Sequence, residues 1–592
     1  MYPGVFFRLT ARLLLWGLPL SAIGQAVSDY TIPQIQGSEW KSPLQKQTVR
    51  VVGVVTASFQ EKGQLGGFFI QDPTGDSNPF TSDGLFIHHT APPQVKAGFL
   101  VRVSGTADEY KGLTEITKVT AVEILDSGKN IQPTPLKLPV SSMAILEQHE
   151  GMLITIRQPL MVISNENLGT YGELMLGTSR LFHPTTTIDP NDADASGNTF
   201  KGAFNTAAVT RQEDLNKRSR LILDDGKLEK NPRPIPYLEP GQPTLRNGSL
   251  TESVTGILTY AFGQYRVHPT EAVVFKYAER LSLPPSNPKD LVIASFNVWN
   301  FFNGDGQGGG FPTPRGAQSL QELNRQAEKL YAALQALDAD IVGLMEIEND
   351  GDDAYSAIAT LVRGLNHVLG APVYDYIRDP AEGKLFPPRD EIKVAIIYKK
   401  DKVTPVGTPR ADTSAVFQRL PLAQTFTIRA TGKPLTVIVN HFKSKRCNEA
   451  TGPNADQGDG QGCYNALRTK QAEALAHFAH HLSKELTGLL LIGDFNSYHE
   501  EDPLDLLKAS GFRLLTPHDY TFIGQSGEAG SLDHVLVSPD LLPNVTGVHV
   551  WHINADEPAV LNYRLENPPA LYQPDAYRSS DHDPLIIYLE ME

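Results

Sequence analysis

Six polar clusters adjoin short apolar runs in the C-terminal half of the sequence. Four clusters follow their run and two precede it: Asn297, Glu346, Asn440-His441 and Asp494 follow, and Asp533-His534 and Asp581-His582 precede. Carboxylate and amide oxygens hold hard divalent cations, and a histidine beside a carboxylate can transfer protons. Together these groups have the chemistry that hydrolysis of a phosphodiester bond requires.

The apolar runs have the length and composition of buried β-strands. They cover residues 291–296, 341–345, 435–439, 489–493, 535–537 and 585–587. If the last two run antiparallel to the other four, all six clusters meet at one edge of the sheets. A single strand-terminal aspartate is more often a turn or a helix cap, and a single histidine is more often a structural residue. Six clusters in this order are much harder to explain by capping, so we expect an active site at that edge.

Amphipathic helices alternate with these strands. Apolar residues recur at spacings of three and four from Leu320 to Leu337, directly before the run at 341–345. A second helical pattern extends from Ala466 to Leu482, before the run at 489–493. This alternation predicts an α/β sandwich in the C-terminal half.

The pattern before residue 282 is different, because short β-patterned runs there are separated by turn signals. It predicts an OB-like β-barrel over residues 27–133 and a second β-rich module over 134–281. Prolines between 282 and 289 predict an extended linker to a catalytic domain at 290–592. Such barrels often bind single-stranded nucleic acid on aromatic side chains. We expect most of the candidates to lie in the core instead: Phe68, Phe69, Phe86 and Tyr110.

The amino terminus has the pattern of an export signal. Arg8 and Arg12 precede an apolar stretch at 13–23, and small residues follow, which predicts a signal peptide over residues 1–26. The stretch is too short to span a bilayer, and we expect no membrane anchor elsewhere. We therefore expect a secreted protein of the medium or the periplasm, with no obligate protein partner. In that setting Cys447 and Cys463 favour a disulfide over two free thiols.

The bulk charge limits how the protein could contact nucleic acid. At 592 residues the chain is long enough for several domains, and it has a net charge of −15. This sign argues against a passive coat protein that binds DNA through a broad basic surface. It weighs less against a hydrolase, because carboxylates neutralised by divalent cations can still bind a phosphate.

The six clusters resemble the successive motifs of the endonuclease/exonuclease/phosphatase superfamily over residues 291–592. The motifs are Phe296-Asn297, Leu344-Met345-Glu346, Asn440-His441-Phe442-Lys443-Ser444, Gly493-Asp494-Phe495-Asn496, Ser531-Leu532-Asp533-His534 and Ser580-Asp581-His582-Asp583-Pro584. With the barrel, residues 315–317 and the loop at 456–463, the chain is most similar to the bacterial extracellular nucleases of this superfamily. The resemblance implies a four-layered α/β sandwich.

The resemblance also implies a metal site. Glu346 and Asn297 would bind the metal, with Asp581 as a further ligand. Family members often carry glutamine directly before this glutamate, whereas Met345 stands here. Glu348, two residues on, is an alternative ligand on the same strand face.

The remaining roles that the resemblance implies concern the attacking water, the phosphate and proton transfer. Asp494 would position or deprotonate the attacking water, and Asn496 would hold a phosphate oxygen. Asp533 would orient His582 and raise its basicity. His441 would be a second acid or a phosphate contact near the leaving oxygen.

Four cationic residues are candidates for phosphate contacts, although surface Lys and Arg side chains usually bind nothing specific. They are Arg325, Lys329, Arg419 and Lys443. The loop between the cysteines contains Asp456 and Asp459 among glycines, so it is either a structural Ca²⁺ site or a solvated loop.

The leading hypothesis is an extracellular deoxyribonuclease that uses Mg²⁺ or Mn²⁺, with Ca²⁺ as a further cofactor. It would leave 5′-phosphate and 3′-hydroxyl ends, as the superfamily usually does, and RNA would be a secondary substrate. A phosphatase or a phospholipid or sphingomyelin phosphodiesterase on the same scaffold is the second hypothesis, because fold alone does not choose a substrate. The third is an inactive DNA-binding adhesive protein.

Overall fold

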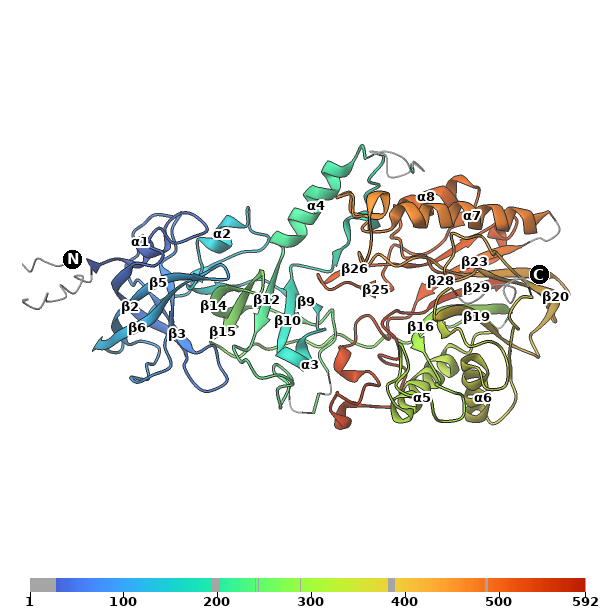
Figure 1. Ribbon diagram of the computed structural model, residues 1–592, viewed down its shortest axis with the longest axis horizontal. Coiled ribbons are helices and arrows are strands. Elements are labelled where there is room, and N and C mark those ends of the chain that lie inside the picture. The colour runs from blue at the N-terminus through green and yellow to red at the C-terminus, as the bar shows by residue number, and fades with distance from the viewer. Residues whose placement is uncertain are drawn as a thin grey trace, which may run out of the picture.

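The computed structural model describes residues 28–192, 200, 203–239, 241–242, 244–287, 289–381, 389–484 and 488–590. The expected signal peptide at 1–26 lies outside these residues. Three sheet-rich parts follow one another along the long axis of the molecule (Figure 1). Among the described residues, no helix is long and apolar enough to cross a membrane.

The first part is a curved six-stranded sheet that closes on itself. Its strand order is β1-β2-β3-β4-β6-β5, and β2 also pairs with β5. Its strands are β1 (Ser28–Asp29), β2 (Thr48–Phe59), β3 (Gly67–Gln71), β4 (Gly84–His88), β5 (Leu100–Tyr110) and β6 (Leu113–Asp126), with helix α1 (Ile32–Gln36) beside them. Phe68, Phe69 and Phe86 are buried, as expected for core residues, whereas Tyr110 is exposed.

The second part is an eight-stranded sheet in the middle of the molecule, which we call the middle sheet. Its order is β13-β9-β10-β12-β15-β14-β8-β7. The strands are β7 (Thr134–Pro135), β8 (Leu153–Ile156), β9 (Leu160–Ser164), β10 (Glu173–Gly177), β12 (Arg220–Asp224), β13 (Leu250–Thr251), β14 (Val254–Ala261) and β15 (Gln264–Pro269). Three helices accompany them: α2 (Ala144–Glu147), α3 (Leu168–Tyr171) and α4 (Thr206–Arg218).

The C-terminal part contains two six-stranded sheets. The first has the order β18-β19-β17-β16-β29-β28 and the second has the order β20-β21-β22-β23-β27-β24. The first sheet consists of β16 (Asp290–Phe301), β17 (Ile341–Glu348), β18 (Tyr374–Tyr376), β19 (Ile392–Lys399), β28 (Val545–Val550) and β29 (Leu585–Glu590). The second consists of β20 (Val403–Ala411), β21 (Leu422–Ile428), β22 (Pro434–His441), β23 (Leu489–Asp494), β24 (Arg513–Leu514) and β27 (Asp533–Val537).

Helices cover the outer face of each sheet. On one side α5 (Leu320–Leu337) and α6 (Ala357–Leu369) pack on the first sheet, and on the other α7 (Asn465–Ser483) and α8 (Asp502–Ala509) pack on the second (Figure 1). A third apolar core fills the space between the two sheets. The expected four-layered α/β sandwich is confirmed.

A small three-stranded sheet joins the middle sheet to the C-terminal part. It has the order β11-β26-β25, where β11 (Leu181–Phe182) belongs to the chain segment of the middle sheet and the other two, β25 (Phe522–Ile523) and β26 (Glu528–Gly530), form a hairpin of the C-terminal part. Buried ion pairs support the same contact, since Arg246 binds Glu557 at 2.7 Å and Arg180 binds Asp556 at 3.0 Å. The C-terminal part therefore packs directly on the part that contains the middle sheet.

Candidate active site

Strand direction brings the six polar clusters together. β16 is parallel to β17 and antiparallel to β29, while β22 is parallel to β23 and β23 is antiparallel to β27. Within the second sheet, Asp494 is paired with His441 on one side and Asp533 on the other. The antiparallel orientation expected for the last two strands is confirmed, and the clusters share one edge of the sandwich.

Two hydrogen bonds connect the two sheets at this edge. His582, which precedes β29 of the first sheet, bonds through Nδ1 to Oδ2 of Asp533 in the second sheet at 2.7 Å. Asn297 Nδ2 donates to Asp494 Oδ2 across the same gap at 3.3 Å. All four side chains are buried. The site is therefore formed only when both sheets are packed together.

The His582–Asp533 pair is polarised by its surroundings. Burial disfavours the charged imidazole, but the charge and hydrogen bond of Asp533, together with the charge of Asp494, raise the pKa of His582 well above its ordinary value. Thr521 Oγ1 donates a second hydrogen bond of 2.7 Å to the same Asp533 oxygen. His582 is therefore held in one orientation as an imidazolium at neutral pH.

The pKa of Asp494 is also raised, but mainly by burial. Burial, with the nearby charge of Asp533, raises its pKa to about 7, although His582 and the backbone N–H of Asn496 oppose the shift. A carboxylate with such a pKa can accept a proton near neutral pH. His441 Nε2 lies 3.4 Å from Asp494 Oδ2. Burial and the charge of Arg419 hold the pKa of His441 well below its ordinary value, so this imidazole is neutral.

The donor set around Glu346 fits a divalent cation. Oε2 of Glu346 is buried and has no hydrogen-bond partner among the described residues. Burial and the charge of Asp581 raise the pKa of Glu346. The backbone of Glu346 is left-handed (φ 67°), at a register shift of β17, which is a strained conformation for a residue with a side chain. Two neighbouring carboxylates with an unused buried oxygen suit Mg²⁺ or Mn²⁺.

A second donor set lies beside the first. Ligand atoms of Asp494, Asp533 and His582 lie within 4.8 Å of one another. A protonated imidazole cannot bind a metal, however, and His582 already uses Nδ1 for Asp533. The carboxylates of Glu346 and Asp581 are therefore the better fit for a metal, and the second set is better suited to proton transfer.

Asn297 connects the two donor sets. Its Nδ2 also donates to Glu346 Oε1 at 3.3 Å, and its Oδ1 accepts from the backbone N–H of Trp299 at 3.0 Å. In this orientation Asn297 holds both carboxylates in place. That its amide oxygen binds the metal stays a prediction. Glu348 accepts instead from the backbone N–H of Asn303, at 2.9 Å.

Asn496 supports the β23 end of the site. Its backbone N–H donates to Asp494 Oδ1 at 2.8 Å, and its Nδ2 donates to the carbonyl of Phe442 at 3.2 Å. The side chain therefore connects the loop after β23 with the loop after β22. Its predicted contact with a phosphate oxygen stays a prediction.

The cationic candidates occupy different environments. Arg419 is buried and donates to the carbonyl of His441 (3.1 Å), to that of Phe442 and to Asp390 (3.2 Å), so it braces the end of β22. Lys443 lies over the ring of Tyr464. Arg325 lies over the ring of Tyr572, and Lys329 is paired with Asp575. Phosphate binding by Arg325, Arg419 and Lys443 stays a prediction.

Three supporting residues were not identified from the sequence. Thr521 holds Asp533, Ser580 Oγ donates to the carbonyl of Asn297 at 2.7 Å, and the ring of Phe522 lies 5.0 Å from that of His582. Ser580 stands in a motif beside Asp581, which is a signal that could have identified it. Thr521 and Phe522 do not adjoin any of the six apolar runs, so only the tertiary fold brings them to the site.

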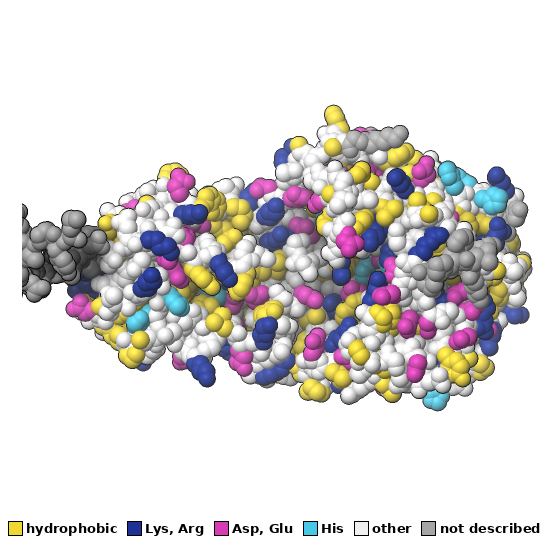
Figure 2. All heavy atoms as spheres, viewed as in Figure 1, with side chains coloured by type: hydrophobic (Ala, Val, Ile, Leu, Met, Phe, Trp, Pro, Cys, Tyr) yellow, Lys and Arg dark blue, Asp and Glu magenta, His cyan; other side chains and the backbone are white. Residues whose placement is uncertain are grey.

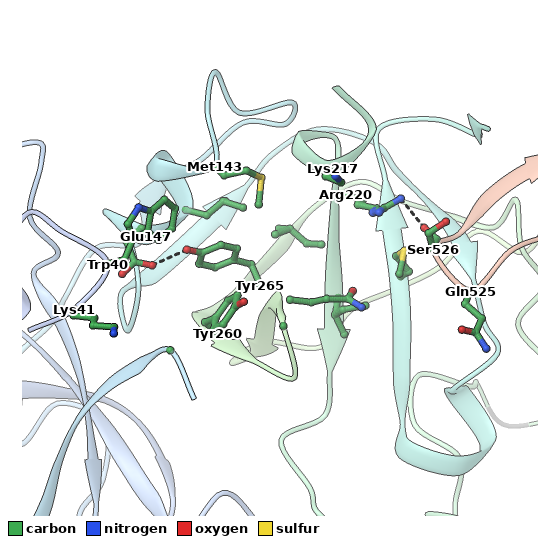
Figure 3. Close-up of a pocket in the computed structure, with 17 residues that line it drawn as sticks. Trp40, Lys41, Met143, Glu147, Lys217, Arg220, Tyr260, Tyr265, Gln525 and Ser526 are labelled. Carbon is green, nitrogen blue, oxygen red and sulfur yellow. Dashed lines mark hydrogen bonds between the residues drawn. The ribbon is translucent and has the colours of Figure 1, made fainter. Parts of the chain in front are cut away.

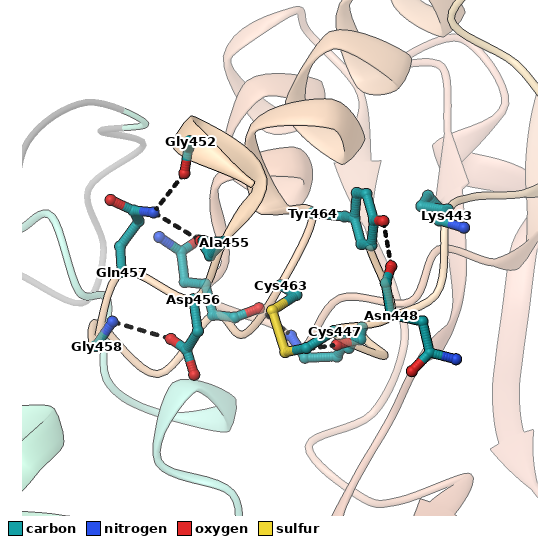
Figure 4. Close-up of a disulfide and its surroundings, with 12 residues drawn as sticks. Lys443, Cys447, Asn448, Gly452, Ala455, Asp456, Gln457, Gly458, Cys463 and Tyr464 are labelled. Carbon is teal, nitrogen blue, oxygen red and sulfur yellow. Dashed lines mark hydrogen bonds between the residues drawn. A yellow bond between two sulfur atoms is a disulfide. The ribbon is translucent and has the colours of Figure 1, made fainter. Parts of the chain in front are cut away.

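The cysteine loop follows β22 along the chain. Cys447 and Cys463 form the expected disulfide (Figure 4). Asp456 Oδ1 accepts from the N–H of Gly458 at 2.9 Å, and Asp459 Oδ1 accepts from that of Gln461 at 3.0 Å. Each carboxylate thus closes its own turn. A Ca²⁺ ion in this loop stays a prediction.

Comparison with models of protein families finds a family match for the C-terminal half. Residues 294–582 match the model of the Endonuclease/Exonuclease/phosphatase family. The C-terminal half is a domain of this family. Residues 114–279, which include all strands of the middle sheet, match a second model that is described as a domain of unknown function. A comparison with curated proteins finds no match.

Several solved structures resemble the endonuclease/exonuclease/phosphatase domain. One, an endonuclease/exonuclease/phosphatase from Bacteroides vulgatus, is 17% identical with a TM-score of 0.33, and the match covers 51% of this chain and 99% of that chain. A mannosyl-6-phosphatase from Bacteroides thetaiotaomicron is 16% identical with a TM-score of 0.31, covering 50% and 98%. TDP2 of D. rerio complexed with single-strand DNA product is 17% identical with a TM-score of 0.32, covering 50% and 98%.

Proposed function

We propose that the protein is a secreted, metal-dependent nuclease that hydrolyses phosphodiester bonds of DNA, with RNA as a secondary substrate. The observation that carries this proposal is the buried His582–Asp533 pair beside Asp494 and the unused oxygen of Glu346. An acid, a base and a cation site within one small region are what attack of water on a phosphodiester requires.

The side chains divide the proton transfers between them. Asp494 has a pKa near 7 and accepts a proton from the attacking water. His582 stays protonated through Asp533, so it binds the phosphate and donates a proton to the leaving oxygen. The neutral His441 donates a hydrogen bond, and Asn496 contacts a phosphate oxygen. A divalent cation held by Glu346, Asp581 and Asn297 supplies Lewis-acid polarisation of the phosphate when bound.

The surface charge is compatible with this mechanism. Cationic and anionic side chains are scattered over the viewed face, with no broad basic surface (Figure 2). This agrees with the net charge of −15. Affinity for the polymer must therefore come from the cation site and from local contacts rather than from a long-range field.

The test is digestion of closed circular and linear DNA, with and without Mg²⁺. We expect the wild-type protein to cut both substrates with Mg²⁺ and neither in EDTA, and to leave 5′-phosphate ends. His582→Ala should lower the rate by at least about 100-fold. His477→Ala is the matched control, because His477 is exposed on α7, and it should leave the rate unchanged.

The same assay should include sphingomyelin, inositol phosphates and RNA. Turnover of only the small or lipid substrates would show that the nuclease proposal is wrong. Equal DNA hydrolysis by the wild-type protein and His582→Ala would show that the site is wrongly assigned. Linear products from closed circles would establish endonucleolytic cutting.

A further inference from the structure

Two adjoining cavities lie along one face of the middle sheet. Their volumes are about 750 and 720 Å³, and both are lined by Met175, Ile222, Gln264 and Gln525. They therefore form one groove, which we call the sheet groove. Three parts of the chain contribute to it: the barrel with Trp40 and Lys41, the middle sheet, and the β25–β26 hairpin of the catalytic half (Figure 3).

Aromatic side chains are exposed along the sheet groove. Trp40 is 55% exposed, Tyr171 is 42% exposed and Phe262 is 77% exposed, and each lines one of the two cavities. The guanidinium of Arg266 lies over the ring of Phe262 at 5.1 Å, and Lys230 lies over that of Tyr171 at 5.7 Å. Soluble proteins seldom expose several large aromatic rings in one place unless they bind something there.

The charge of the sheet groove is opposite to that of the whole chain. Its lining has six cationic and four anionic side chains, although the chain as a whole has a net charge of −15. Arg266 already binds two of the anions, Glu173 and Asp224. Four lysines remain exposed along the groove: Lys41, Lys217, Lys227 and Lys230. The lining thus has an excess of positive charge, which suits a polyanion.

The β25–β26 hairpin connects the sheet groove with the catalytic centre. Gln525 and Ser526, at the tip of the hairpin, line the groove, and Arg220 of β12 donates to the carbonyl of Ser526 at 2.7 Å. At the base of the hairpin, the ring of Phe522 lies 5.0 Å from that of His582. The hairpin therefore joins the lining of the groove to a residue beside the reacting histidine.

We propose that the sheet groove binds a single-stranded stretch of the nucleic-acid substrate and holds it for the catalytic half. Unpaired bases stack on exposed aromatic rings, while lysines contact the phosphates. Paired bases in a duplex hide these faces, so the aromatic groove selects a single strand. This inference rests on the proposed nuclease function and assigns substrate binding to the middle sheet.

Binding can be measured separately from hydrolysis. Fluorescence anisotropy of a labelled oligothymidylate of about 20 nucleotides, long enough for a site of this kind, should be recorded with His582→Ala in EDTA. Adding Trp40→Ala or Phe262→Ala should weaken binding by about 5- to 100-fold, as expected for loss of one stacked base. Phe204→Ala is the matched control, because Phe204 is 81% exposed and lies outside the groove lining.

Charge reversal gives a second, independent readout. Lys217→Glu with Lys230→Glu should weaken binding and lower the slope of log affinity against log salt concentration by about 0.7 for each phosphate that a lysine no longer neutralises. Lys433→Glu, at an exposed turn between β21 and β22, should change neither. All of these side chains are exposed, so the substitutions leave the cores intact.

The same groove substitutions in the otherwise wild-type protein should raise KM for long single-stranded DNA. They should leave hydrolysis of bis(4-nitrophenyl) phosphate, which is too small to reach the groove, unchanged. Unchanged oligothymidylate affinity in both variant sets would overturn the proposal, and an equal loss of duplex affinity would overturn its single-strand assignment. Failure of the proposed function appears separately, as uncut DNA with the wild-type protein.

Discussion

Replacing Asp533 with asparagine tests what the negative charge of Asp533 contributes to the His582–Asp533 pair. Asp533 Oδ2 accepts from His582 Nδ1 and from Thr521 Oγ1, both at 2.7 Å. An asparagine oxygen can occupy the same position and accept both hydrogen bonds. Asp533→Asn therefore removes the negative charge and keeps the shape of the site.

The expected loss follows from how deeply the pair is buried. Asp533 is 1% exposed and His582 is 6% exposed. Opposite unit charges about 4 Å apart attract by about 4 kcal/mol at an effective dielectric constant of about 20. Because the hydrogen bond is kept, we expect about 3 kcal/mol of transition-state stabilisation to be lost, which lowers kcat at neutral pH by roughly 100-fold. KM should change little, because Asp533 acts through His582.

The pH profile separates this role from a structural one. Since the charge of Asp533 raises the pKa of His582, the alkaline limb of kcat should move to lower pH in Asp533→Asn. Asp340→Asn is the matched control, because Asp340 is also buried and pairs with Lys399 at 3.3 Å, just before β17 and at the opposite end of that strand from Glu346. It should keep its kcat. A kcat of Asp533→Asn within about threefold of wild type, or an unmoved alkaline limb, would refute the reasoning.

Three further predictions concern the cation site, the buried His552 and the disulfide of the cysteine loop. Glu346→Gln should raise the Mg²⁺ concentration for half-maximal activity at least about tenfold, with a parallel loss of Mn²⁺ binding by calorimetry; unchanged binding would remove Glu346 from the metal site. Burial disfavours charge on His552, but Asp519 and Asp583 raise its pKa to about 10, above the unfolded value of about 6.5. Its stabilisation is therefore complete below about pH 6.5 and is lost as pH rises through about 10. His552→Gln should lower the free energy of unfolding by on the order of 4 kcal/mol at pH 6 and by little at pH 10.5, and a pH-independent difference in denaturant titrations would contradict this. Cys447→Ser with Cys463→Ser should cost about 3 kcal/mol of stability for a loop with a sequence separation of 16; equal melting of reduced and oxidised wild-type protein would argue against it.

Regular elements of the catalytic half were predictable because their signals are local. The helix expected from Leu320 to Leu337 is α5 with the same bounds, since its apolar spacing matches the helical repeat. Two strand ends were predictable for a similar reason, because β22 ends at His441 and β23 ends at Asp494, where the buried run meets polar residues. β16 and β17 instead continue past Asn297 and Glu346, to Phe301 and Glu348. The expected meeting of the clusters depended on two antiparallel strands, and β27 and β29 have that direction.

Side-chain environments were less predictable. Arg419 was a candidate for binding phosphate, but its guanidinium is buried against the carbonyl of His441. Nothing around Thr521 in the sequence indicates that its hydroxyl bonds Asp533, twelve residues away. These contacts depend on how loops after different strands pack, and periodicity has no information about loop packing.

The sequence by itself determined which residues can do the chemistry and near which ends of the strands they stand, because strand burial and helix amphipathicity are properties of neighbouring residues. Only the tertiary structure decided how they act together. Packing of two sheets brings His582 to Asp533 and Asn297 to Asp494. The charges of Asp533 and Asp494 then raise the pKa of His582 against the effect of burial, and burial raises the pKa of Asp494 to about 7. The sheet groove likewise exists only because the barrel, the middle sheet and the β25–β26 hairpin meet. Such long-range contacts set desolvation and charge pairing, and neither can be obtained from the order of residues along the chain.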